Sequence, residues 1–140
     1  MKGIRFFAAL YAAKLATVAL SVMHRNGTHM PGVLAMKICP DFLGRMDKPK
    51  TIIGITGTKG KSTTSSLTYH FLSACGFKTM LIGNIGVPPL ERFEEMTPDT
   101  VAVCEMSCHQ LEFVHHSPEI AVLLNIFPEH LDHYVSLEAY

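Results

Sequence analysis

The chain has 140 residues, of which 48% are hydrophobic and 17% charged, so it is long and apolar enough to bury one sizeable core. Its 12 basic and 12 acidic side chains give a formal net charge of zero, which argues against a nucleic-acid-binding protein with a broad basic surface and favours a small partner. The four cysteines lack paired C-x-x-C spacing, which indicates a reduced cytoplasmic setting rather than a disulfide framework. A metal half-site at Cys104 and Cys108 is disfavoured because no second Cys or His pair stands at ligand spacing.

Residues 4–23 (IRFFAALYAAKLATVALSVM) are apolar enough to raise the question of a membrane span. Lys14 interrupts the run midway, and a lysine at a bilayer centre costs about 2.5 to 3.5 kcal/mol, so a cytoplasmic helix is favoured. A secretory signal peptide is the disfavoured alternative, because Arg25-Asn26-Gly27 is not a small-residue cleavage site. The helix is expected to end at Asn26-Gly27, and a peripheral membrane contact stays open for it. Its expected face comprises Phe7, Leu10, Tyr11, Lys14 and Leu15.

From Lys50 onward the pattern alternates between strands and helices. Strands are predicted at 51–56 (TIIGIT), 78–83 (KTMLIG), 101–105 (VAVCE) and 119–126 (EIAVLLNI), the last apolar on both faces. A helix is predicted over 61–75, with Leu67, Phe71, Leu72 and Cys75 on its apolar face and a stop at Gly76. Continuous apolar strands separated by helix-length segments indicate an α/β fold with a parallel sheet covered on both sides. Ligands of such sheets bind at the carboxyl ends of the strands, and all four predicted strands end in polar residues.

The segment TGTKGKSTT (56–64) lies between a predicted strand and a predicted helix. The strict spacing G-x-x-x-x-G-K-[ST] would need glycine at position 55, where Ile55 stands, so the loop is shorter by one residue. Small residues here expose backbone N–H groups, and the helix start adds its positive dipole end, which together favour a polyphosphate. Lys61, which we expect to point into solvent-filled space, would neutralise the terminal phosphates, and Ser62 would be a magnesium ligand. Ordinary Ser/Thr capping of a helix is the disfavoured alternative.

The shortened loop resembles T-G-T-x-G-K-[ST]-T, the version found in the Mur ligases and folylpolyglutamate synthases. Three further segments agree in order: GNIGVPPL (83–90) and EMSCHQLE (105–112) are similar to segments of the glutamate-adding branch of the Mur ligases, and NIFPEHLDHY (125–134) resembles N-I-[ST]-P-[DE]-H-L-D-R. The resemblance covers residues 51–140. It implies the first part of that family's central ATP-binding domain, a parallel-sheet fold of the P-loop NTPase kind.

This resemblance implies ATP and Mg²⁺ as cofactors and a reaction in which a carboxylate is phosphorylated and an amine then attacks the acyl phosphate. Lys61, Glu105 and His130 would be catalytic, and Ser62, Glu105 and His130 would hold magnesium. The alternative for Glu105 is a solvated or capping glutamate, and the alternative for His130 is a surface histidine. The nucleotide would contact the loop from Gly57 to Thr63, that is Gly57, Thr58, Lys59, Gly60, Lys61, Ser62 and Thr63.

Two further residues are expected to contact the carboxylate substrate. Asn84 follows the second strand, and a turn residue is an equally good explanation of this asparagine. Ser107 begins a helix, and N-capping is the alternative explanation of this serine. His115 and His116 are adjacent and would point to different helix faces, so they are expected on the surface. Three departures from the family pattern stand out: Lys59 replaces asparagine, Cys108 replaces serine, and Phe127 replaces Ser or Thr, which puts the substrate geometry in question.

About fifty residues precede the loop, too few for an independent domain of usual size. AAKLA (12–16) and RNGTHMPGVLAMKICPDFL (25–43) resemble the helical leader of the MurT-type subunit of lipid II isoglutaminyl synthase. We therefore expect a helical leader over residues 1–48 and the N-terminal part of the ATP-binding domain over 49–140. The leader's resemblance favours a lipid-linked precursor, whereas the glutamate-adding branch uses a nucleotide sugar, and both stay open.

The family's magnesium-holding carbamylated lysine would fall beyond Tyr140, so we expect these residues to belong to a longer ligase and not to ligate alone. The favoured function is a cytoplasmic ATP-dependent ligase that joins a muramyl-peptide precursor to an amino acid or amine. A folylpolyglutamate synthase-like ligase is the second hypothesis. A nucleotide-binding or scaffold module without catalysis is the third, supported by Phe127 and the unusual leader.

Overall fold

The structure is a computed structural model that describes residues 3–23, 29–86, 89–112, 114–130, 132–134 and 136. The chain divides into two compact units, residues 1–48 with 88–97 and residues 49–87 with 98–140. The assignment of a leader to 1–48 and an ATP-binding domain to 49–140 stays a prediction. The expected helix stop at Asn26-Gly27 lies outside the described residues.

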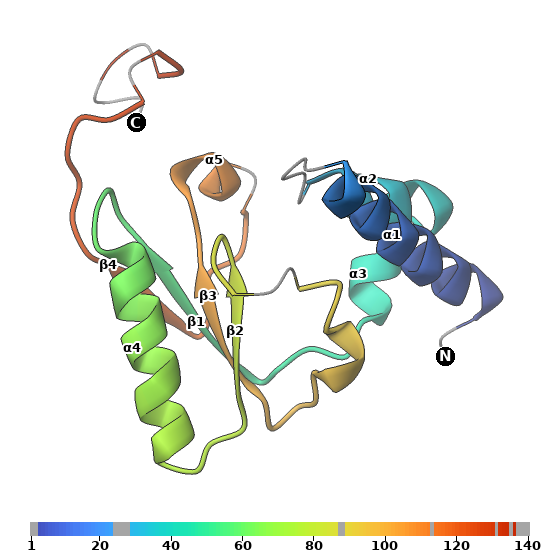
Figure 1. The fold of residues 1–140 in the computed structure, drawn as a ribbon, viewed down its shortest axis with the longest axis horizontal. Coiled ribbons are helices and arrows are strands. Elements are labelled where there is room, and N and C mark those ends of the chain that lie inside the picture. Colours follow the sequence, from blue (N-terminus) through green and yellow to red (C-terminus); the bar gives the residue numbers. More distant parts are fainter. Residues whose placement is uncertain are drawn as a thin grey trace. The chain divides into compact units, whose positions relative to one another are not determined.

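The first unit is helical. It contains α1 (Ile4–Val22), α2 (His29–Ile38), α3 (Phe42–Arg45) and the short 3₁₀ helix η1 (Phe93–Glu95) (Figure 1). The rings of Phe6 and Phe42 stack with their centroids 5.0 Å apart. They belong to a buried cluster that combines small residues with large ones: Phe6, Ala9, Leu10, Ala13, Ala35, Cys39 and Phe42. Burial of these side chains stabilises the unit.

The buried face of α1 differs from the expected one. Leu10 is buried as predicted, but Phe7, Tyr11 and Leu15 are exposed. The alanines on the buried face allow α2 to approach closely, so this face combines Phe6 and Leu10 with small residues. Lys14 forms an ion pair with Glu94 at 3.1 Å. Among the described residues, none of the helices has the length and hydropathy of a membrane span, and a peripheral membrane contact of α1 stays a prediction.

The second unit is an α/β domain built on four parallel strands, with α4 packed against them, which confirms the predicted fold class. They are β1 (Thr51–Thr56), β2 (Thr79–Gly83), β3 (Val101–Glu105) and β4 (Ile120–Leu123), arranged in the order β2-β3-β1-β4. Helix α4 (Lys61–Ala74) follows β1, and the short α5 (Cys108–Leu111) follows β3 (Figure 1). Ile55 of β1 pairs with Glu105 of β3, and Gly83 of β2 pairs with Glu105 from the other side. The carboxyl ends of these three strands therefore lie next to one another.

The core of this unit comprises Ile53, Ile55 and Val103, with Tyr69 and Leu72 of α4 packed against it. Three of the four residues predicted on the apolar face of α4 are exposed. Leu67 and Phe71 are 66% and 69% exposed and Cys75 is exposed, while Ser65 is buried instead. The packing stripe of α4 therefore runs along Ser65, Tyr69 and Leu72, which are separated by four and three residues.

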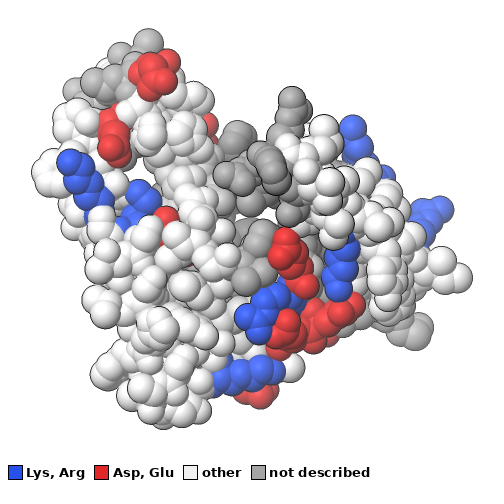
Figure 2. Space-filling model, viewed as in Figure 1, with Lys and Arg blue, Asp and Glu red and all other residues white. Residues whose placement is uncertain are grey.

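The fourth strand is shorter and more exposed than predicted. It covers four residues, and Ile120 and Leu123 are exposed. Strand β4 pairs with β1 alone and is an edge of the sheet in the described structure, so it is not buried on both faces. Charged side chains of both signs are interspersed on the face shown in Figure 2, and much of that face is uncharged.

Candidate active site

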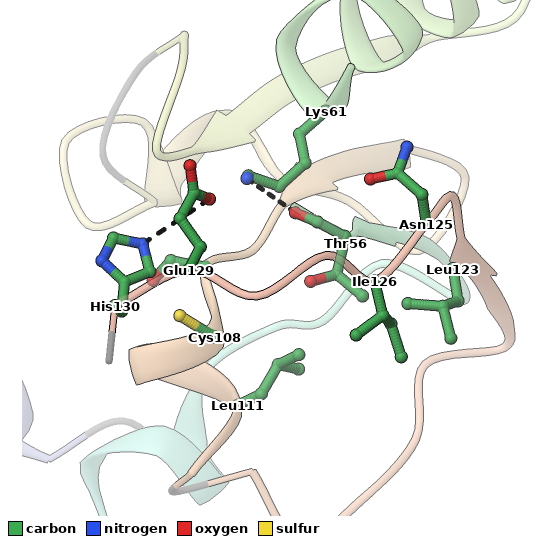
Figure 3. A pocket seen from close by; sticks show the side chains of 11 residues that line it. Thr56, Lys61, Cys108, Leu111, Leu123, Asn125, Ile126, Glu129 and His130 are labelled. Atoms are coloured by element: carbon green, nitrogen blue, oxygen red, sulfur yellow. Dashed lines mark hydrogen bonds and ion pairs between the residues drawn. The ribbon is translucent and has the colours of Figure 1, made fainter. Parts of the chain in front are cut away.

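A pocket opens where β1 and β3 end, and the described residues that line it come from four segments. Gly57 and Lys61 come from the loop and start of α4, Ser107 from the segment after β3, and His130 from the segment after β4 (Figure 3). The cavity has a volume of about 150 Å³. Sites for whole drug-sized ligands start at about 300 Å³, so the cavity between the described residues has room for a small anionic group such as a phosphate rather than for an entire nucleotide.

The loop between β1 and α4 needs glycine at two positions. Gly57 has φ 132° and Gly60, the N-cap of α4, has φ 85°, both in the region that L-residues rarely adopt. A Cβ atom at Gly57 would lie 2.9 Å from the carbonyl oxygen of Asn125. The glycines therefore permit the sharp turn and allow the loop to lie against the chain that follows β4.

Asn125 occupies part of the loop's hydrogen-bonding capacity. The N–H of Thr58 donates to the Asn125 carbonyl at 3.0 Å, and the N–H of Lys59 donates to the Asn125 side-chain oxygen at 2.8 Å. These two donors are used within the protein, which the sequence did not predict. The N–H groups of the first turn of α4 have no partner inside the helix, so they are the amides that could meet an anion.

Lys61 is half-buried and does not extend freely into solvent as expected. Its Nζ donates to the carbonyl oxygens of Gly57 at 2.7 Å and Thr58 at 3.0 Å. Both partners are neutral carbonyls, so neither places a negative charge against the lysine at the wall of the pocket. The positive charge of Lys61 favours an anion there.

Glu105 is 4% exposed, and its Oε2 atom has no hydrogen-bond partner among the described residues. A buried carboxylate oxygen without a partner is costly unless a cation reaches it. Hard oxygen ligands are those that Mg²⁺ prefers, so this donor fits the predicted metal. The N–H of Asn84 donates to the carbonyl of Glu105 at 3.1 Å, and the Asn84 side chain is exposed and does not line the pocket.

Ser107 forms a capping box at the start of α5. Its hydroxyl accepts from the N–H of Gln110 at 3.3 Å, and its own N–H donates to the Gln110 side chain at 2.9 Å. The capping explanation of this serine is therefore realised in the structure, and its substrate contact stays a prediction. Ser62 and Thr63 lie in the first turn of α4 and are exposed. His115 and His116 are exposed, as expected.

His130 lines the same pocket as Gly57 and Lys61. It is the one described residue other than glycine with a positive φ, 55°, a conformation that costs a non-glycine residue about 1 kcal/mol or more. Figure 3 shows His130 and Glu129 on the side of the pocket that Lys61 faces, with Cys108 beneath them. The loop, Glu105 and His130 thus lie at one edge of the sheet, and their catalytic roles stay predictions.

Sequence reasoning missed a second group of donors beside the pocket. The ligand atoms of Cys108, His109 and His130 all lie within 4.8 Å of one another. The sequence pairs Cys108 with Cys104 only as a disfavoured metal half-site. Cys104 lies in β3, and burial raises the pKa of its thiol. The adjacent Cys108-His109 pair was the available signal. Its partner comes from a segment more than twenty residues away in sequence, which no spacing rule connects.

Glu112 joins the same region. It accepts a hydrogen bond from the Tyr134 hydroxyl at 2.5 Å and lies 3.1 Å from His133 Nε2. The Tyr134 bond, followed by the His133 bond, lowers the pKa of Glu112, and the same carboxylate raises the pKa of Tyr134. The segment after β4 is thereby tied to the end of α5.

Comparison with known proteins gives a consistent family. Residues 55–140 match the model of the Mur ligase middle domain. The chain is 45% identical over 92 residues to the UDP-N-acetylmuramoylalanine--D-glutamate ligase of Clostridium kluyveri, covering 66% of this chain and 20% of that protein. It is 45% identical over 89 residues to the ligase of that name from Symbiobacterium thermophilum (64% and 20%) and 42% identical over 92 residues to that from Acetivibrio thermocellus (66% and 20%). The chain thus spans about a fifth of the length of these relatives.

Proposed function

Because this chain belongs to the Mur ligase family, we propose that the protein is an ATP-dependent ligase that joins the carboxylate of a muramyl-peptide precursor to the amine of an amino acid. Residues 49–140 would form part of its ATP-binding domain and residues 1–48 a helical leader. A reaction that consumes ATP favours the cytoplasm as its location. The muramyl precursor is proposed because the relatives are named UDP-N-acetylmuramoylalanine--D-glutamate ligases.

The observation that carries the proposal is the buried carboxylate of Glu105, whose Oε2 has no hydrogen-bond partner among the described residues and which pairs in register with Ile55, two residues before Gly57. A carboxylate in that position is stabilised by a divalent cation, and Ser62 and His130 would complete the set of protein ligands for Mg²⁺. Bound Mg²⁺ would screen the negative charge between a triphosphate and the substrate carboxylate. These side chains fit Mg²⁺, because Glu105 and Ser62 both offer oxygen ligands at the carboxyl edge of the sheet.

The segment from Gly57 to Thr63 would surround the phosphates. Since the amides of Thr58 and Lys59 donate to Asn125, the contacts would come from Lys61 and from the free amides of the first turn of α4. The ammonium of Lys61 would leave the carbonyls of Gly57 and Thr58 and neutralise charge that develops on the transferred phosphoryl group.

The substrate carboxylate, held near Asn84 and Ser107, would attack the terminal phosphorus and displace ADP. The amine would then attack the acyl phosphate and release inorganic phosphate, which leaves an amide. Lys61, Glu105 and His130 contribute charge neutralisation and positioning rather than covalent chemistry. This assignment of roles explains why a cation, a buried anion and an imidazole are needed at one edge of the sheet.

Phosphate release by the full-length protein tests the proposal. ATP, Mg²⁺, UDP-N-acetylmuramoylalanine and D-glutamate should together give phosphate release that depends on both substrates. A parallel reaction with a pteroate acceptor and glutamate should give none. Phosphate release with the pteroate acceptor alone would favour the folylpolyglutamate-type ligase, and ATP binding without turnover on muramyl acceptors, nucleotide-linked or lipid-linked, would favour the scaffold module.

A further inference from the structure

Three soft or borderline donors meet beside the pocket, at the junction of α5 and the segment after β4. Cys108 Sγ and His109 Nδ1 are 3.4 Å apart, and the ring of His109 lies 5.0 Å from that of His130, centroid to centroid. The ligand atoms of all three residues lie within 4.8 Å of one another. Cys108 is half-buried, whereas His109 and His130 are exposed, so an ion from solvent can reach them.

The donor set differs in chemistry from the predicted magnesium site. Thiolate and imidazole ligands favour zinc and similar transition metals, whereas Mg²⁺ demands oxygen ligands in octahedral geometry. Tetrahedral zinc, with bonds of about 2.0 to 2.3 Å, places its ligand atoms about 3.3 to 3.8 Å apart. The Cys108–His109 separation of 3.4 Å already meets this requirement, and rotation of the exposed His130 ring can shorten the remaining distances.

The surroundings hold these donors in place. Ser107 caps α5 and fixes the start of the helix that carries Cys108 and His109. The ring of His133 lies 4.7 Å from that of His109, and Glu112 lies 3.1 Å from His133 Nε2. The carboxylate of Glu112 thus holds His133, a neighbour of the proposed ligand His109, rather than a ligand itself.

We propose that Cys108, His109 and His130 form a transition-metal site that takes Zn²⁺, with solvent in the fourth position. Coordination converts the Cys108 thiol to a thiolate, and its proton leaves to solvent. His130 is also the predicted imidazole ligand of the magnesium site, so one imidazole serves two metal sites of different chemistry. Zn²⁺ at the thiolate site withdraws His130 from Mg²⁺, which couples the ligase to the availability of zinc.

The metal alone, added to the metal-free full-length protein, tests this site without nucleotide or substrate, so its outcome is independent of the proposed ligase activity. Co²⁺ replaces Zn²⁺ as a spectroscopic probe, because thiolate ligation gives a sulfur-to-cobalt charge-transfer absorption. We expect this absorption to saturate at one equivalent and to be lost when Zn²⁺ is added. It should vanish in Cys108→Ser and persist in Cys75→Ser, which changes an exposed cysteine outside the cluster.

His109→Ala should weaken Co²⁺ binding by more than about tenfold, since even the loss of an outer-shell partner costs about that much. A second measurement uses the unaltered protein and does not depend on the folding of variants. Zn²⁺ should slow alkylation of Cys108 by iodoacetamide, while alkylation of Cys75 in the same sample keeps its rate. Absence of the charge-transfer absorption, its persistence in Cys108→Ser, or equal alkylation of Cys108 with and without Zn²⁺ would overturn the proposal.

Discussion

Asn125 and Lys59 are joined by two hydrogen bonds, although 66 residues separate them in sequence. The N–H of Lys59 donates to the Asn125 side-chain oxygen at 2.8 Å, and the Asn125 side-chain nitrogen donates to the Lys59 carbonyl at 2.9 Å. The side-chain amide of Asn125 thus both accepts from and donates to the main chain of Lys59, as a residue of a neighbouring strand would. The glycine-rich loop is thereby fixed to the end of β4.

Replacing Asn125 with alanine should remove both side-chain bonds and loosen the loop at Lys59, while the main-chain bond from Thr58 to the carbonyl of residue 125 stays. We expect the free energy of unfolding to fall by about 1 to 2 kcal/mol, because each bond contributes about 0.5 to 1.5 kcal/mol. ATP affinity should fall as well, since the loop must be ordered before it binds phosphate. Urea unfolding and nucleotide titration measure the two effects. Asn125→Asp keeps the acceptor for Lys59 and should lose less stability than the alanine variant; the reverse order would contradict this account.

Gly57→Ala should destabilise the protein through two separate effects. The backbone has φ 132°, and the new Cβ would lie 2.9 Å from the Asn125 carbonyl oxygen. We expect a loss of about 2 kcal/mol or more in the free energy of unfolding. Gly76→Ala is the matched control, because Gly76 has φ 87° but nothing within 4 Å of the added Cβ. It should cost about 1 kcal/mol, from backbone strain alone. Equal losses in the two variants would show that contact with Asn125 is unimportant.

The sequence predicted the strands well where they are short apolar runs that end at glycine or at polar residues. The bounds of β1 and β3 match the runs TIIGIT and VAVCE, and the glycine-rich loop lies where its spacing placed it. These features depend on local chemistry: β-branched residues favour strands, and glycine permits the turn. The carboxyl-edge position of Glu105 also followed, because parallel strands end on the same side.

The faces of the helices could not be predicted in this way. In α1 and α4 several large apolar residues, among them Phe7 and Phe71, lie in solvent, while Ala9 and Ser65 are buried. Helical periodicity indicates that a helix has an apolar stripe. It does not decide which of two overlapping stripes is buried, because that depends on how closely the neighbouring helix or sheet approaches. The bonds between Thr58 and the main chain of Phe127 likewise join residues 69 positions apart, beyond the reach of any local pattern.

Lys61→Ala should reduce ATP turnover by at least about a hundredfold, the cost of removing one electrostatic contact from a transition state. The variant also loses the hydrogen bonds to Gly57 and Thr58, so the free energy of unfolding should fall by about 1 kcal/mol. Steady-state phosphate release and urea unfolding separate the two effects. Lys50→Ala, at the opposite end of β1, is the control and should keep the parent rate. Turnover near the parent rate in Lys61→Ala would exclude the phosphate role.

Tyr134→Phe should shift the titration of Glu112. The Tyr134 hydroxyl is the largest cause of the lowered pKa of Glu112, and His133 adds to it, so the variant's pKa should rise towards the usual value. A carboxyl whose pKa is lowered by folding stabilises the native state above its ordinary pKa, and this contribution is lost as the pH falls through the folded value. The acid-induced loss of stability should therefore be smaller in the variant. NMR titration of the Glu112 carboxyl measures the shift, and an unchanged pKa would show that the hydroxyl is not the cause.

Glu105→Gln should separate the destabilising effect of the buried carboxylate from its role in holding Mg²⁺. Without metal, the variant should be at least as stable as the parent, because a buried carboxylate whose Oε2 has no partner among the described residues is replaced by a neutral amide. With ADP held constant, Mg²⁺ at 100 times its dissociation constant should raise the parent's free energy of unfolding by about 2.7 kcal/mol and leave the variant nearly unchanged. Thermal unfolding with and without Mg²⁺ measures both quantities. Glu119→Gln is the control, because Glu119 accepts a hydrogen bond from the N–H of Ile52 at 2.9 Å, away from the pocket, and should keep the full response to Mg²⁺. An equal response to Mg²⁺ in Glu105→Gln and the parent would mean that the buried carboxylate does not hold the ion.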